Sequence, residues 1–206
     1  ENTHGPGLPV AGAFTNPTSL DNGGEGLKIE DASSSTIKEF TYDNNLPWPT
    51  APGGTGPSLV LVNPGANPDP SLPGNWRSST VSGGNPGTHD ATTFTGNPGD
   101  DVDANGLDDL LDYALGHAPG ARDGLPVIAR SGAFVTLSWM ENLAADDATI
   151  TPQWSVDLVN WDAPGETFAL AGLTPDGLGR REIVYTIQPS SLPPGDRLYF
   201  RLSVSR

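Results

Sequence analysis

Residues 134–139, Phe134-Val135-Thr136-Leu137-Ser138-Trp139, form the stretch that decides the fold class of this chain. Apolar and polar side chains alternate along it, and a period of two is typical of a β-strand with one buried face. Strand-like stretches recur on both sides of it. They are residues 27–29, 36–42, 58–62, 149–156, 181–187 and 197–204. The pattern predicts an all-β protein built from short strands.

Composition supports the same fold class. The chain has 206 residues, of which 26 are glycine and 21 are proline, and such residues interrupt helices and favour turns. Five tryptophans, four tyrosines and six phenylalanines are spread over both halves, enough to anchor modest cores. The length allows one large domain or two small ones.

Charge and cysteine content exclude several classes of function. The net charge is −15, so the chain would repel the phosphates of a nucleic acid. Cysteine is absent, which excludes disulfides, thiolate metal sites and a cysteine nucleophile. Apolar runs are all shorter than the roughly 18 residues that a membrane-spanning helix needs. The acidic balance suits a calcium-rich setting, outside the cell or at its surface.

A calcium-binding loop is predicted in the acidic stretch Asp100-Asp101-Val102-Asp103-Ala104-Asn105-Gly106-Leu107-Asp108-Asp109-Leu110-Leu111-Asp112. Oxygen-bearing residues stand at positions 1, 3, 5, 9 and 12 of a window that starts at Asp101, with glycine at position 6. The expected calcium ligands are Asp101, Asp103, Asn105, the carbonyl of Leu107, Asp109 and Asp112.

A short helix is predicted over residues 107–116, directly after this loop. Leucines recur there at helical spacing, and Gly116 is a plausible stop. Two departures from a paired EF-hand stand out. Asp112 replaces the longer glutamate at position 12, and Asp108 stands where an apolar residue is usual. The alternative interpretation is an acidic helix start, where carboxylates favour the positive end of the helix dipole.

Three pieces of residues 20–88 resemble the second half of the bacterial lamin-tail-like domain, an immunoglobulin-like β-sandwich. They are Leu20-Asp21-Asn22-Gly23-Gly24-Glu25-Gly26-Leu27-Lys28-Ile29, then Phe40-Thr41-Tyr42 with Pro47-Trp48-Pro49, and Asn75-Trp76-Arg77. The first strands of that family are missing here. Either the chain is cut from a longer one, or another segment completes the sheet. In the second case the resemblance implies an open sheet edge, which an extended arm at residues 1–19 or a neighbouring subunit would complete.

The rest of the chain resembles the ends of secreted proteins from verrucomicrobia-like bacteria. Residues 97–118 are similar to dockerin and thrombospondin type 3 calcium loops. Residues 123–206, with Trp154 through Trp161 and the final Phe200-Arg201-Leu202, resemble a small terminal β-sandwich. The expected architecture is two small immunoglobulin-like units joined by a calcium loop and one short helix.

The remaining histidines and acidic pairs are expected to have structural and not catalytic roles. His4, His89 and His117 have no recognisable catalytic frame, and no sequence argument unites Asp21 with Glu25. The pair Asp146-Asp147 reads as a polar turn, with a second, weaker calcium site as the alternative.

The tryptophans are more often core anchors in small β domains than sugar-stacking platforms. Trp139 and Trp154 lie on predicted strands and are the expected core members. Trp48, which two prolines flank, is the best candidate for an exposed ring.

The function expected from the sequence is non-enzymatic. It is that of an extracellular structural or surface-assembly protein, stabilised by calcium, that associates with itself or with another surface protein. The alternative is a carbohydrate-binding or adhesive module of a larger secreted enzyme, with polysaccharide as partner.

Overall fold

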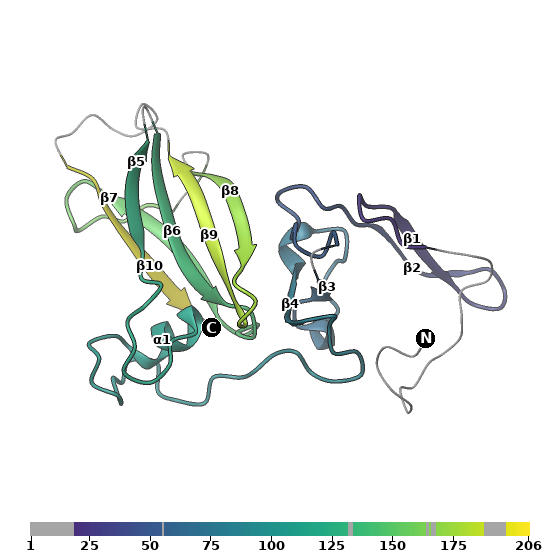
Figure 1. Ribbon diagram of the computed structural model, residues 1–206, viewed down its shortest axis with the longest axis horizontal. Coiled ribbons are helices and arrows are strands. Elements are labelled where there is room, and N and C mark those ends of the chain that lie inside the picture. Colours follow the sequence, from purple (N-terminus) through teal and green to yellow (C-terminus); the bar gives the residue numbers. More distant parts are fainter. Residues whose placement is uncertain (1–18, 55, 132–133, 164, 166–167, 188–196) are drawn as a thin grey trace. The chain divides into compact units, whose positions relative to one another are not determined.

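The computed structural model describes residues 19–54, 56–131, 134–163, 165, 168–187 and 197–206 (Figure 1). These residues form an all-β protein, as the sequence predicts, with ten strands, one short α-helix and two single-turn 3-10 helices. Most of the predicted N-terminal arm, residues 1–18, lies outside the described residues.

The contacts divide the chain into two compact units, residues 1–90 (unit 1) and 91–206 (unit 2). The acidic loop and the α-helix that follows it, α1 (Asp109–Leu115), belong to unit 2.

Unit 1 contains two separate antiparallel pairs of strands. The first pair is β1 (Gly26–Glu30) with β2 (Thr36–Thr41), and the second is β3 (Pro57–Leu61) with β4 (Trp76–Ser82). Turns of 3-10 helix at Pro64–Ala66 and Pro73–Asn75 lie between β3 and β4. Each pair is a two-stranded sheet, which is marginally stable by itself, so contacts between the pairs have to support unit 1.

Aromatic rings provide such contacts. The rings of Phe40 on β2 and Trp76 on β4 are stacked, with centroids 5.4 Å apart. Trp48, in the loop after β2, packs 6.2 Å from Trp76. A buried ion pair between Arg77 of β4 and Asp90 joins β4 to the end of the unit, and Thr80 donates to the same carboxylate.

Unit 2 contains a four-stranded and a two-stranded antiparallel sheet. The strand order of the larger sheet is β5-β6-β9-β8, and β7 pairs with β10 in the smaller one (Figure 1). The bounds are β5 (Val127–Ser131), β6 (Phe134–Asn142), β7 (Thr149–Ser155), β8 (Phe168–Pro175), β9 (Arg180–Ile187) and β10 (Tyr199–Ser205).

Both sheets and the helix of unit 2 contribute to one apolar core. Its buried members are Leu115, Leu137, Trp139, Phe168, Ile183 and Ile187. Side chains of the smaller sheet, such as Trp154 and Phe200, pack against this cluster. The prediction that Trp139 and Trp154 are core members is therefore confirmed for Trp139, while Trp154 is half-buried at the edge of the cluster.

Candidate metal centre

The acidic loop is fixed to the start of α1 by hydrogen bonds that close it on itself. The backbone N–H of Asp109 donates to the carbonyl oxygen of Asp100 at 2.7 Å. The Asp109 carboxylate in turn accepts from the N–H of Val102 at 3.0 Å. Gly106 has a φ of 85°, in the left-handed region that glycine adopts without steric cost, and this allows the sharp turn into the helix.

Asn105 is the residue around which the loop carboxylates gather. Its backbone N–H donates to Oδ1 of Asp101 at 3.0 Å and to Oδ1 of Asp103 at 3.1 Å. The other oxygen of Asp101 accepts from the N–H of Gly106 at 2.9 Å. The first and third positions of the predicted calcium loop are therefore turned toward the fifth.

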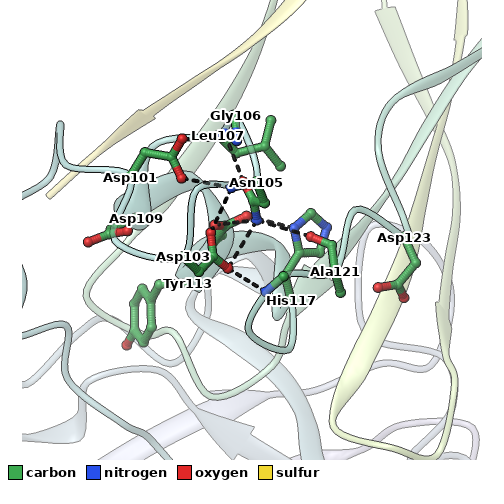
Figure 2. Close-up of polar contacts among 12 residues, drawn as sticks. Asp101, Asp103, Asn105, Gly106, Leu107, Asp109, Tyr113, His117, Ala121 and Asp123 are labelled. Atoms are coloured by element: carbon green, nitrogen blue, oxygen red, sulfur yellow. Dashed lines mark hydrogen bonds and ion pairs between the residues drawn. The ribbon is translucent and has the colours of Figure 1, made fainter.

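The helix contributes a third carboxylate to this cluster. Nδ2 of Asn105 donates to Oδ2 of Asp112 at 2.9 Å. It also donates to Oδ2 of Asp103 at 3.2 Å (Figure 2). The same nitrogen donates to the carbonyl of Ala121 at 3.1 Å. Residues at positions 1, 3, 5 and 12 of the loop thus come together although they are up to 11 residues apart.

The electrostatics of the cluster favour a cation. The pKa of Asp103 lies below its usual value, chiefly because the N–H of Gly120 donates to its carboxylate, so this group is anionic at neutral pH. The amide hydrogens of Asn105 supply partial positive charge between Asp103 and Asp112. Carboxylate, amide and carbonyl oxygens are the ligands that calcium prefers, so the donor set fits this ion.

Two of the six predicted ligands do not join this group. The carboxylate of Asp109 accepts a hydrogen bond from the N–H of Val102 at the start of the loop. Leu107 contacts the cluster through its N–H, which donates to Oδ1 of Asn105 at 2.8 Å, and not through its carbonyl. Ligation by Asn105 would require its carboxamide to turn its oxygen inward. Within the described residues, no three acidic or histidine side chains already stand at the spacing of ligands to one ion.

His117 is a member of this centre that the sequence interpretation passed over. Its Nδ1 lies 2.8 Å from Oδ1 of Asp112, its side chain is fully buried, and its Nε2 has no partner among the described residues. Gly116, with φ of 71°, ends the helix in a left-handed conformation, and the N–H of His117 then donates to the carbonyl of Asp112. This Schellman stop is the sequence signal that places His117 beside Asp112.

Asp147 is used in structural contacts. Its carboxylate accepts hydrogen bonds from the hydroxyl of Tyr113 at 2.7 Å and the N–H of Phe94 at 3.1 Å, and it pairs with Arg206 at 2.8 Å. Arg206 also lies over the ring of Phe94, 5.5 Å from its centroid. These partners account for Asp147 without a second calcium site.

The prediction that Trp48 carries an exposed ring is wrong. Only 8% of its surface is accessible, and its ring packs against Trp76. The adjacent Pro49 is also buried. In unit 2, Trp161 is half-buried, and the guanidinium of Arg201 lies 4.2 Å from its ring centroid.

No known protein family and no curated protein matches this chain. Among the described residues, no helix has the length and apolar character that crossing a membrane requires.

Proposed function

We propose that this chain is a non-enzymatic extracellular structural protein, stabilised by calcium, that assembles through the strands of unit 1. The observation that carries the proposal is the incomplete state of unit 1. Trp48 is the one large apolar side chain buried among its described residues, whereas the buried apolar cluster of the chain lies in unit 2.

The strands of unit 1 offer backbone groups to another strand. Among the described residues, each of β1, β2, β3 and β4 pairs on one side only. The other side of such a strand presents N–H and C=O groups that an additional strand can bond. Strand addition would also supply apolar side chains to a unit that buries few of its own.

Apolar side chains are exposed on the same strands. Ile29 on β1, Ile37 on β2 and Val81 on β4 are 58%, 63% and 48% accessible. Ile37 stands at the irregular step in the pairing of β1 with β2, where Glu30 pairs with Thr36. Covering these side chains would gain roughly 25 cal/mol for each Å² of apolar surface removed from water, which favours association.

Calcium enters the proposal as a stabiliser of unit 2. The ion would be held by Asp101, Asp103, Asn105 and Asp112, and it would supply the charge that neutralises their mutual repulsion. The same helix that carries Asp112 places Leu115 in the core of unit 2, with no accessible surface. Ion binding at the loop therefore supports the helix and, through it, the core.

The alternative, a carbohydrate-binding or adhesive module, would have to use a ring other than Trp48. Trp48 is only 8% accessible and cannot serve as a sugar-stacking platform.

Size-exclusion chromatography with light scattering tests the assembly proposal by measuring the mass of the full chain. The measurement covers a range of concentrations, with calcium and with a chelator. We expect mass to rise with concentration, and we expect Ile37→Lys to return the chain to a monomer. Leu178→Lys is the matched control, because Leu178 lies in unit 2 and is 85% accessible. A wild-type chain that remains monomeric at every concentration contradicts the proposal.

A further inference from the structure

Unit 1 has a cavity of about 420 Å³, open to solvent, between its two pairs of strands. Leu27 and Phe40, directly paired across β1 and β2, line it on one side. Leu59 of β3 and Trp76 of β4 line it on the other side. A volume of this size lies within the range of small-molecule sites in proteins.

The wall of the cavity is aromatic. Phe40 and Tyr42 alternate along the chain at the end of β2, so they share one face, and the ring of Trp76 is stacked on Phe40. The hydroxyl of Tyr42 donates to the carbonyl of Asp21 at 2.7 Å, which fixes the position of this ring. Faces of aromatic rings carry negative electrostatic potential and attract cations.

The rim of the cavity is acidic. Asp21 and Asp43 both line it, and Asn22 and Asn44 add two carboxamides. Oδ1 of Asp21 accepts from the N–H of Gly23, and Oδ1 of Asp43 accepts from the N–H groups of Asn44 and Asn45.

Among the described residues, no hydrogen bond reaches the second oxygen of either carboxylate. Neither Asp21 nor Asp43 forms an ion pair with another described residue, and lysine, arginine and histidine do not occur among the described residues that line the cavity. The cavity therefore combines negative charge and aromatic faces without a cation of its own.

We propose that this cavity binds an ammonium group carried on a short aliphatic chain, which is the chemistry of a lysine side chain. The aliphatic stem would lie against Leu27 and Leu59, while the charged head meets the rim carboxylates and the aromatic faces. An anion is repelled by the rim, and a wholly apolar ligand would remove the carboxylates from water without a compensating charge. Carboxylates, aromatic faces and apolar side chains together therefore favour an aliphatic ammonium ligand.

Two sources can supply the ammonium group, a free alkylamine or a lysine within an extended peptide. The proposal goes beyond the assembly function and does not depend on strand addition, because a free amine needs no backbone partner. A lysine-bearing segment added beside β2 would connect the two proposals.

The test follows the indole N–H signal of Trp76 by NMR in the full chain, together with calorimetry. The probes are hexylamine, 1-hexanol and hexanoate, which share their chain length and differ in charge, and short peptides that carry lysine or norleucine. We expect saturable shifts with hexylamine or the lysine peptide and none with the neutral or anionic probes. The stronger of the two cations identifies the source.

Two variants test the assigned residues. Asp43→Asn keeps an oxygen for the loop hydrogen bonds but removes the charge, and we expect it to weaken cation binding about tenfold, equivalent to ~1.4 kcal/mol. Phe40→Leu removes an aromatic face and should weaken it as well. The control is Asp69→Asn, since Asp69 accepts from Ser71 in unit 1 and does not line the cavity.

Three outcomes overturn the proposal. They are equal binding of hexylamine and 1-hexanol, absence of any shift at Trp76 with either cation, and unchanged affinity in Asp43→Asn. A failure of assembly in the light-scattering test would leave these readings unaffected, because they follow binding at the ring of Trp76 and not the mass of the particle.

Discussion

Gly106 illustrates how single residues set the geometry of the acidic loop. Its φ of 85° lies in the left-handed region, and an added Cβ would find open space, with only the end of the Arg122 side chain 3.8 Å away. The cost of a side chain at this position is therefore one of backbone conformation and not of crowding.

We expect Gly106→Ala to destabilise unit 2 by about 1–2 kcal/mol, the usual cost of a left-handed conformation in an L-residue. Urea unfolding followed by tryptophan fluorescence measures this change. Gly99→Ala is the matched control in the same loop, because Gly99 has no neighbour within 4 Å of an added Cβ and an ordinary φ. Equal effects of the two substitutions would show that the conformation of Gly106 is not required.

Asp157 makes the stability of the turn after β7 depend on pH. Its carboxylate accepts from the N–H groups of Asn160 and Val159, at 2.8 Å each, and these bonds hold its pKa far below the usual value near 3.9. Because the folded state holds this proton less tightly than the unfolded state, the turn contributes stability above about pH 4. That contribution is lost as the pH falls toward the lowered pKa.

We expect Asp157→Asn to be less stable than the wild type at pH 7, with the difference shrinking below pH 4. Midpoints of urea unfolding at pH 7, 4 and 3 measure it. A difference that is constant over this range would mean that the charge of Asp157 does not support the turn.

At the scale of elements, the sequence predicts strands best where one face is buried and the other is not. The alternation at residues 134–139 corresponds to β6. Pro152 lies in β7, which pairs with β10 alone among the described strands, and a proline is tolerated in such an edge strand. The leucine spacing predicts a helix over residues 107–116, and the observed helix is Asp109–Leu115, with Gly116 as its stop.

In three strands, the alternation of apolar and polar side chains is weak. β4 buries Ser78 and Ser79, which are polar, so no apolar alternation marks it. β5 exposes both Val127 and Ile128, and β8 contains Gly172 at an irregular step of its pairing. These strands form because they pair with residues that are far apart from them in the sequence. A local sequence pattern does not contain that information.

The spacing of residues in the acidic loop predicts part of the candidate metal centre but not His117. The spacing of oxygen-bearing residues predicts six converging ligands. The structure brings Asp101, Asp103, Asn105 and Asp112 together, but the oxygens of Leu107 and Asp109 do not join them. Spacing says nothing of His117, because its position depends on the chain reversing at Gly116.

Leu115 is the residue by which α1 supports the core of unit 2. We expect Leu115→Ala to lower the free energy of unfolding of unit 2 by roughly 2–5 kcal/mol, since the side chain is fully buried and leaves a cavity. Val102→Ala, in the acidic loop before α1 at a position that is 81% accessible, should change this free energy little. Thermal unfolding by circular dichroism compares the two, and similar melting temperatures would contradict a core role for α1.

At the scale of the whole molecule, the two units should respond differently to calcium. The candidate ligands all lie in unit 2, so we expect added calcium to raise the melting temperature of unit 2 and to leave that of unit 1 unchanged. Differential scanning calorimetry with calcium, magnesium and a chelator measures both transitions. Asp103→Asn is the variant that should lose the response, and a calcium effect that persists in it would place the ion elsewhere.

The packing of Trp48 against Trp76 has a spectroscopic consequence. The two indoles lie 6.2 Å apart at an interplanar angle of 37°, close enough for their electronic transitions to couple and to give a paired positive and negative circular-dichroism band. Because both chromophores belong to unit 1, disappearance of that couplet during unfolding would report on unit 1 alone, without any label.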